Sequence, residues 1–298
     1  MKIIARRRLW FGISIFMVTI SALALIFWGL TLGIDFKGGT IYEAEFNKKV
    51  GASQVKQALA DLNLPNLLVQ IKGESDVTIK TAPLSEEQIK NVKEKFLQKI
   101  GESREISLDN VGPTVSKSLT KKAIISVILA CVGIVLYLAI AFRKVPKPVS
   151  SWRFGISAVI ALFHDIIITL GAYSLFGHFF NFEVDSLFVV ALLTILGFSV
   201  HDTIVVFDRI RENLRNNPGE DFENVTELSV NQTLVRSSNT SLTVMMVLAA
   251  LLLIGGKTLQ HFIAILLVGI TSGTYSSIFN AAPVLVVWQN FIKRKARA

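Results

Sequence analysis

Six long apolar stretches constrain what this chain can fold into more than any other feature of its sequence. A helix that crosses a bilayer needs about 20 predominantly apolar residues, and stretches of this kind occupy 9–30, 121–142, 153–176, 184–207, 233–255 and 261–290. Charged residues make up only 18% of the chain, whereas soluble domains contain about 25%. The sequence therefore predicts an α-helical membrane protein with six transmembrane helices.

The first apolar stretch resembles a signal peptide because Arg6, Arg7 and Arg8 precede it. Its apolar part is longer than the 7–15 residues usual in a signal peptide, and no A-x-A cleavage site follows it. We therefore interpret residues 1–34 as an uncleaved signal anchor that forms the first transmembrane helix.

Basic residues at the ends of the spans predict the orientation of the chain. Lysines and arginines of short flanking segments stay on the cytoplasmic side. Here they precede the first span, separate the second from the third, and follow the fourth and sixth: Lys2, Arg6–Arg8, Arg143, Lys144, Lys147, Arg153, Arg209, Arg211, Arg215, Lys293, Arg294, Lys295 and Arg297. We expect both termini in the cytoplasm. The net charge of +9 is divided among these segments and forms no single patch, which argues against a nucleic-acid partner.

A polar segment at 35–118 separates the first two spans and must then face outward. Four alternating runs predict strands at 40–46, 66–71, 76–81 and 104–111. Two helices are expected between them, at 52–62 and at 85–100, and the second opens with a capping box from Ser85 to Gln88. The order βαββαβ predicts an extracytoplasmic ferredoxin-like domain. Residues 119–298 then form the remaining five helices and a cytoplasmic tail.

Charged side chains inside the apolar stretches are the candidate functional residues, because a charge in hydrocarbon costs several kcal/mol unless something answers it. Asp202 in the fourth span and Arg236 in the fifth lie in the same leaflet, with Asp202 about 7–8 Å from the cytoplasmic end of its span. We predict that they form a pair; a static ion pair that only joins two helices is the alternative. The candidate supporting polar residues are His201, Asp165, His164, Thr203, Asp208 and Arg209. The two histidines can equally form structural hydrogen bonds, and Asp208 and Arg209 can be interfacial.

Other chemistries lack their signatures. The chain has no H-E-x-x-H motif and no glycine-rich phosphate loop, so neither a metal site nor a nucleotide site is expected. Gly38–Gly39 is too short a signal for a nucleotide. Asp165 and Asp202 could imitate an intramembrane aspartyl protease, but the residues around them do not fit the G-x-G-D pattern. Gly269 and Gly273 are four residues apart in the sixth span and predict close helix packing. We expect this face to contact a second subunit.

Five segments together resemble the SecD/SecF family of bacterial protein-export membrane proteins, RND-type transporter halves, and within it the smaller SecF-type subunit. They are GIDFKGGT (33–40), VGPTVSKSL (111–119), FGISAVIALFHDIIIT (154–169), GFSVHDTIVVFDRIREN (197–213) and NQTLVRSSNTSL (231–242). The resemblance covers the whole chain. One departure is His201, which stands where asparagine is common in the family.

The resemblance implies a subunit of the Sec export machinery in the bacterial cytoplasmic membrane, not an enzyme, and without a cofactor. Together with SecD it would use the proton gradient to promote preprotein translocation after or alongside SecA. The implied partners are SecD, the SecYEG translocon, YajC, YidC, the translocating preprotein and membrane lipids. Asp202 and Arg236 match the proposed proton-relay groups of the family. A half-size RND exporter of lipids or small hydrophobic molecules, and an intramembrane hydrolase, are the alternatives from the residues alone.

Overall fold

A computed structural model describes residues 2–143 and 149–295, which form two compact units. One contains the membrane helices, from residues 1–31, 125–183 and 187–298, and the other contains residues 32–124 and 184–186. Lys144, Lys147 and Arg297, which contributed to the predicted orientation, lie outside the described residues.

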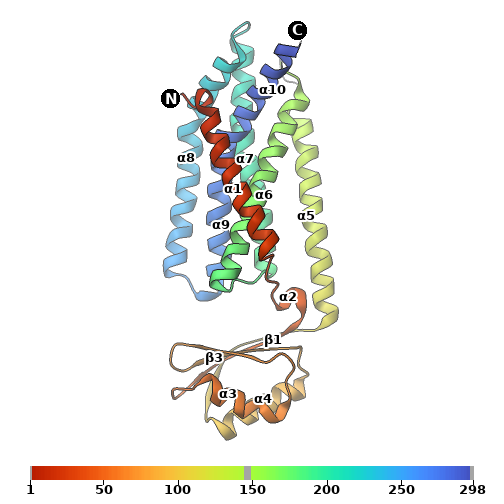
Figure 1. The fold of residues 1–298 in the computed structure, drawn as a ribbon, viewed down its shortest axis with the longest axis vertical. Helices are drawn as coiled ribbons and strands as arrows, with labels where there is room; N and C mark the ends of the chain where they lie inside the picture. Colours follow the sequence, from red (N-terminus) through yellow and green to blue (C-terminus); the bar gives the residue numbers. More distant parts are fainter. Residues whose placement is uncertain (1, 144–148, 296–298) are drawn as a thin grey trace. The chain divides into compact units, whose positions relative to one another are not determined.

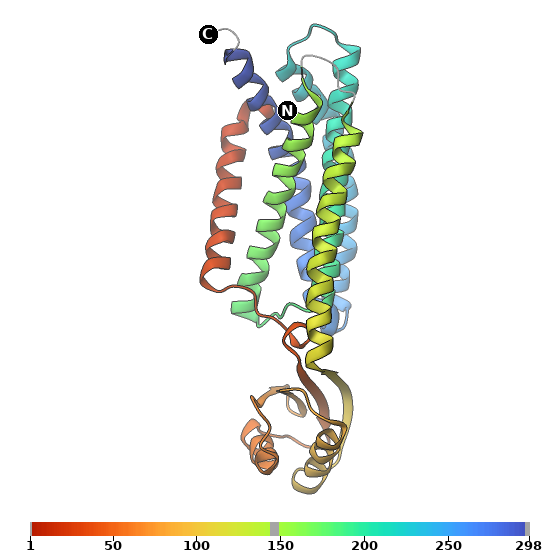
Figure 2. The ribbon, with the colours of Figure 1, turned by 90° about the vertical axis from the view of Figure 1, so that its right-hand side faces the viewer.

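In the part of the chain that the structure describes, six helical segments are long and apolar enough to span a membrane, as predicted. They are Ile4–Phe27, which combines η1 (Ile4–Arg6) with α1 (Arg7–Phe27), then α5 (Pro113–Ala141), α6 (Ser151–Phe180), α7 (Ser186–Asn216), α8 (Phe222–Ile254) and Leu259–Lys295. The last comprises α9 (Lys257–Ser276), a π-helical turn η3 (Ser277–Ala281) and α10 (Ala282–Lys295). Figures 1 and 2 show α1 beside α6, and the start of α1 at the same end of the bundle as the end of α10.

Two predicted helix boundaries are wrong on the side that carries the basic residues. We expected the fourth span to end at 207, but α7 continues to Asn216; we expected the fifth to begin at 233, but α8 begins at Phe222. The Asp221 side chain caps α8 by accepting a hydrogen bond from the Glu223 backbone N–H. Both extensions are amphipathic, and the apolar-run criterion misses them because charged residues interrupt their hydropathy.

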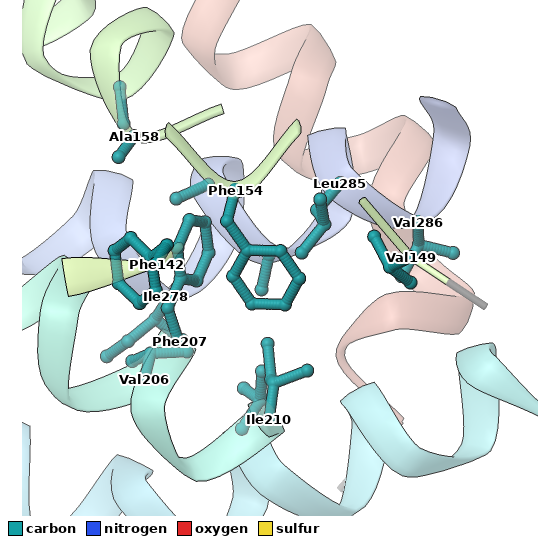
Figure 3. Close-up of a cluster of buried hydrophobic side chains, with 14 of the residues drawn as sticks. Phe142, Val149, Phe154, Ala158, Val206, Phe207, Ile210, Ile278, Leu285 and Val286 are labelled. Atoms are coloured by element: carbon teal, nitrogen blue, oxygen red, sulfur yellow. The ribbon is translucent and has the colours of Figure 1, made fainter. Parts of the chain in front are cut away.

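The bundle packs tightly where aromatic rings from three helices meet. Ring centroids of Phe142, Phe154 and Phe207 lie 5.1–5.7 Å apart, and Figure 3 shows these rings with aliphatic side chains around them. A Cβ atom on Gly171 in α6 would overlap the backbone of Ser21 in α1, so only glycine allows this helix approach. Lipid tails are as apolar as the core, so close packing and polar contacts hold such helices together.

The second unit has the predicted βαββαβ order, and its four strands form an antiparallel sheet. Strands β1 (Gly39–Phe46), β2 (Leu68–Lys72), β3 (Asp76–Thr81) and β4 (Ser103–Val111) form the order β2-β3-β1-β4. Helices α3 (Ala52–Leu59) and α4 (Glu86–Lys99) cover one face (Figure 1). The Ser85–Gln88 capping box is present at the start of α4. Alternate residues of β1 and β3 pack against Phe96 of α4 because side chains alternate across a strand.

The short helix α2 (Ile34–Lys37) leads into β1 through two glycines that the backbone requires. Gly38 and Gly39 have φ angles of +79° and +154°, and a Cβ atom on Gly39 would lie 2.9 Å from the Thr81 carbonyl oxygen. Asp35 in α2 accepts hydrogen bonds from the Ser186 backbone N–H (2.8 Å) and hydroxyl (2.5 Å) at the start of α7. The GG dipeptide therefore has a structural role in the backbone between α2 and β1.

Candidate functional site: two buried carboxylates in the membrane bundle

Asp165 of α6 is fully buried and receives four hydrogen bonds. The Ser199 and Ser276 hydroxyls donate to Oδ2, each at 2.6 Å, and the Ser272 hydroxyl donates to Oδ1 at 2.8 Å. The adjacent His164 Nδ1 lies 3.0 Å from Oδ1. An ionised carboxylate can accept about four hydrogen bonds, so the site satisfies the charged form completely. Asp165 thereby joins α6 to α7 and α9.

The His164 ring extends this network toward α1. Its Nε2 lies 3.1 Å from the Asn280 side-chain nitrogen, and Asn280 Oδ1 accepts a hydrogen bond from the Ser14 hydroxyl at 2.7 Å. Ser14 also lies 3.1 Å from the Tyr275 hydroxyl. With Asn280 donating to Nε2, His164 is the neutral tautomer that carries its proton on Nδ1 and donates it to Asp165.

The π-helical turn η3 lies within this network. It comprises Ser277–Ala281 and follows α9 without a break in the helix. Single π-turns inside α-helices occur frequently at functional sites. Here Ser276 lies just before the turn and bonds Asp165, whereas Asn280 within it bonds His164. Ser276 and Asn280, four residues apart, therefore present polar side chains from consecutive turns of one helix to Asp165 and His164.

Asp202 of α7 is also buried, with 2% of its surface exposed, but it is held more loosely. The Ser241 hydroxyl of α8 lies 3.4 Å from Oδ2, a long contact, and Thr274 of α9 donates to Ser241 at 2.6 Å. The neighbouring Thr203 hydroxyl lies 2.9 Å from that of Ser277. Asp202 is fourteen residues from the end of α7, or about 21 Å at 1.5 Å per residue. The helix thus continues beyond the predicted end of the span at 207, and the depth of 7–8 Å within the membrane stays a prediction.

The structure does not join Asp202 to Arg236. Arg236 is exposed on α8, and among the residues that the structure describes its guanidinium lies within 4 Å of no carboxylate. His201 is exposed as well. The same stretch of α8 exposes further polar side chains: Ser238, Asn239, Thr240 and Thr243. Polar side chains in the middle of a transmembrane helix face a bundle interior or a water-filled cavity rather than lipid, so this face requires a partner or water.

Asp208 and Arg209 lie on the extension of α7 and pair along the helix. Arg211 forms an ion pair with Asp208, and Arg209 with Glu212 at 2.7 Å, both at i,i+3 spacing. Arg209 Nε also donates to the Gln232 side chain of α8 at 2.7 Å. Asp208 and Glu212 are exposed, and an interfacial position for Asp208 and Arg209 stays a prediction.

Sequence reasoning found both carboxylates but missed most of what surrounds Asp165. Ser14, Ser199, Ser272, Ser276 and Asn280 were not singled out. Their signal was present: GITSGTYSSIFN (269–280) places three serines, two threonines and an asparagine in an apolar helix. Close helix packing does not explain so many hydroxyl groups, but the prediction for this helix rested on its glycines alone.

The prediction that Gly273 faces a second subunit is wrong. A Cβ atom on Gly273 would lie 3.0 Å from Ser199 Cβ, and one on Gly269 would overlap the Ile195 side chain, both in α7 of the same chain. Small residues bring α9 close to α7, which places Ser272 and Ser276 within reach of Asp165. Their role lies inside this bundle.

The chemistry available to this site is proton binding and transfer. Across residues 2–143 and 149–295, no group of three or more histidine, cysteine, aspartate or glutamate side chains could hold a metal ion. The buried polar groups are carboxylates, hydroxyls, an amide and an imidazole, which exchange protons along hydrogen bonds.

Comparisons with known proteins agree on one family. The family model described as "Protein export membrane protein SecD/SecF, C-terminal" matches residues 91–291, and the SecD/SecF GG motif model matches residues 24–50. Protein translocase subunit SecF of Thermobaculum terrenum is 42% identical over 97% of this chain and 94% of its own length. The same subunit of Anaerolinea thermophila is 38% identical over 100% and 98%.

Solved structures give the same result. The crystal structure of SecDF from Thermus thermophilus, described as a translocon-associated membrane protein, matches 97% of this chain with a TM-score of 0.82 and 30% identity. A second SecDF structure, in a super-membrane-facing form, matches 100% of the chain with a TM-score of 0.70. The present chain spans 39% of the length of each of these SecDF chains.

Proposed function

The chain belongs to the SecD/SecF family as a SecF-type subunit of the Sec protein-export machinery, and from this premise we propose that it uses the proton gradient, together with SecD, to promote preprotein translocation. It is a multi-pass membrane transport subunit and not an enzyme. The family assignment leaves no support for the intramembrane hydrolase or for the half-size exporter of lipids as alternatives.

The observation that carries the proposal is the loosely held, buried carboxylate of Asp202. Desolvating a charge in a membrane costs several kcal/mol, and a buried ion pair is often no more stabilising than a well-packed apolar pair. Asp202 has fewer donors than Asp165, and in the described ranges no lysine or arginine nitrogen lies within 4 Å of its carboxylate. Its one hydrogen bond by geometry is the long contact from Ser241, and the Thr274 hydroxyl and His201 are its further polar neighbours. Such a group gains from taking up a proton, which removes the charge. Each proton that crosses 100 mV supplies about 2.3 kcal/mol.

Asp202 and Arg236 would then act in alternation rather than as a fixed pair. In this structure the two are separate, and the carboxylate lies among hydroxyls. Moving α7 relative to α8 would bring the arginine to the carboxylate and favour release of the proton, because an adjacent positive charge stabilises the ionised form. The cycle couples helix movement to proton passage. His201, Thr203, Asp165 and His164 are the supporting polar residues in this scheme.

A SecD-type subunit would cover the exposed polar face of α8. Arg236 and Asn239 lie on that face within a membrane-spanning helix, where lipid gives them no hydrogen-bond partner. A second six-helix half can supply partners, or enclose water that does. SecYEG, YajC, YidC and SecA are further proposed partners, on family resemblance. The solved SecDF of Thermus thermophilus is described as translocon-associated.

We place both termini in the cytoplasm. The support is the distribution of basic residues and the joining of both ends: Arg7 pairs with Glu223 at the start of α8, and Asn290 of α10 also donates to Glu223, at 3.0 Å. A cysteine introduced within 85–100 should react with an impermeant thiol reagent added outside intact cells, whereas one at Asn217 should not. The reverse pattern would overturn the orientation.

Export into inverted membrane vesicles, with and without a proton gradient, tests the proposal. Asp202→Asn keeps the size of the side chain but cannot ionise, so it should assemble with SecD and lose the gradient-dependent increment. Arg236→Met should lose it as well, because the proton is no longer released. Asp208→Asn, at an exposed carboxylate six residues away, is the matched control and should retain the increment. Full stimulation in Asp202→Asn vesicles would refute the proposal.

A further inference from the structure

The hydrogen bonds around Asp165 can satisfy either protonation state of its carboxyl group. In the charged state the two oxygens accept from three serines and His164. In the neutral state the new O–H needs an acceptor. Ser276 provides one, because its hydroxyl has a second acceptor of its own in the Gly273 carbonyl, 3.2 Å away. When Ser276 turns its hydrogen to Gly273, its oxygen is free to accept from protonated Asp165, and no heavy atom has to move.

No positive charge neutralises this site. Within the described ranges, no lysine or arginine nitrogen lies within 4 Å of the Asp165 carboxylate, and its one ionisable neighbour is His164. Tyr275 is the titratable group that faces His164 from α9, with ring centroids 6.3 Å apart. Asp165 with neutral His164 therefore carries one net negative charge in the membrane interior. One proton, on either residue, neutralises the pair.

Hydroxyls of α9 lie at both carboxylate sites. Ser272 and Ser276 bond Asp165, while Thr274, between them in sequence, bonds Ser241, which contacts Asp202. Residues two apart on a helix point to different sides, so α9 presents hydroxyls to both carboxylates. On α7, Ser199 bonds Asp165 and precedes Asp202 by three residues. Residues of α7 and α9 therefore lie beside both carboxylates.

We propose that Asp165 and His164 form a second proton-binding station in this half, one that exchanges a proton with the Asp202 region through the hydroxyls of α7 and α9. The step is a protonation only: a carboxylate and a proton give a carboxylic acid, and the Ser276 hydroxyl reorients. The proposal rests on the proposed function and goes beyond it, since it assigns proton binding to a residue outside the Asp202–Arg236 couple.

His164 is the positioning residue of this station. Its Nδ1–H donates to Asp165, while Asn280 holds the opposite ring nitrogen as an acceptor. Asn280 also bonds Ser14 of α1. If the proton were on His164, Nε2 would become a donor, and the Asn280 amide would have to rotate to accept from it. That rotation replaces the acceptor of Ser14 with a donor, so proton binding here changes a contact between η3 and α1.

Infrared spectroscopy of the purified chain in complex with its SecD-type partner tests the station. Protonated carboxyl groups have a carbonyl stretch separate from that of carboxylates, and ¹³C-aspartate labelling identifies the aspartyl bands. Titration of the wild-type complex should show a protonated aspartyl band with two components, one that Asp165→Asn removes and one that Asp202→Asn removes. Asp208→Asn, at an exposed carboxylate, is the control and should leave this band unchanged.

A second variant covers the case in which Asp165→Asn does not fold. Ser276→Ala removes a donor to the charged carboxylate and an acceptor for the protonated one. Because a hydrogen bond to an ionised group is the stronger of the two, the midpoint of the same band should move to higher pH. A purely structural Asp165 would stay charged throughout and would contribute neither a component of the band nor a shift. If Asp165→Asn removes no component of the protonated aspartyl band found in the wild-type complex, the proposal is overturned.

The export assay separates this result from the proposed function. If Asp202→Asn keeps full gradient-dependent stimulation, the proposed function fails, while the infrared band still decides whether Asp165 binds a proton. If the Asp165 component of the band is absent but Asp202→Asn abolishes stimulation, the second station fails and the proposed function stands.

Discussion

Polar side chains differ in burial and hydrogen bonding between the inner and the outer helices of this membrane bundle. About half of the most apolar window is buried in α6, α7 and the α9–α10 span, at 56%, 50% and 56%, whereas α5 and α8 are 6% and 17% buried. On the inner helices, Asp165 has four hydrogen-bond donors from its own chain. On the outer helix α8, Arg236 is exposed. The Asp165 carboxylate is satisfied within the chain, whereas the exposed polar side chains of α8 identify a face that another component must cover.

The largest expected effect on stability comes from removing Asp165. Interhelical hydrogen bonds in membrane proteins contribute about 0.6 kcal/mol each, so Asp165→Ala should lower the free energy of unfolding by about 2–3 kcal/mol. Asp202→Ala should lower it by less than about 1 kcal/mol, because it loses one long contact. Thermal unfolding in detergent compares the two. Equal losses in the free energy of unfolding would show that the two carboxylates contribute equally to stability.

Next in size is the effect of filling the close approach of α9 to α7. Gly273→Leu should destabilise the isolated chain by about 1–3 kcal/mol, as overpacking does, because its side chain would meet Ser199. Gly133→Leu in α5 is the matched control, since a Cβ atom there has no neighbour within 4 Å. If the Gly273→Leu variant is stable but no longer binds the SecD-type partner, Gly273 lies at the contact between the subunits.

Removing the outer arginine should affect assembly more than stability. Arg236→Met should change the free energy of unfolding of the isolated chain by less than about 0.5 kcal/mol, as is usual for surface positions. Co-purification with a SecD-type subunit should fall, because the face of α8 that the partner covers loses the positive charge that contacts the partner. Pull-down yield in mild detergent measures this. Loss of stability in the isolated chain would contradict the exposed position of Arg236.

The smallest effect concerns an exposed ion pair that ties α8 to α10. Lys293 lies 3.0 Å from Asp221, and its hydrogen bond holds the pKa of that carboxyl below its ordinary value. Since the folded-state pKa is the lower one, the stabilisation is present at neutral pH and is lost as pH falls through the acidic range. Lys293→Ala should reduce stability by a few tenths of a kcal/mol at neutral pH, as for surface pairs, and by nothing at acid pH. Thermal midpoints at the two pH values show the difference, and an equal loss at both would exclude the ion pair as its cause.

The sequence was most informative where hydropathy or alternation covers a whole element. The six spans, the βαββαβ order and the Ser85–Gln88 cap are all present. Helix ends at 216 and 222 were missed because amphipathic extensions do not raise the local hydropathy.

Site geometry was less predictable because side-chain partners come from helices far apart in the sequence. Asp165 and Ser276 are 111 residues apart, and no pattern along the chain indicates that they meet. Asp202 and Arg236 were placed together by depth alone, and depth does not determine the direction in which each side chain points around its helix.

Proton uptake by the reconstituted complex tests the central claim most directly. Vesicles containing this chain and its SecD-type partner, with a trapped pH indicator, are given an inward proton gradient with and without a translocating preprotein. The account predicts acidification that depends on the complex, disappears in Asp202→Asn and is retained in Asp208→Asn. Acidification in Asp202→Asn vesicles at the wild-type rate would contradict it.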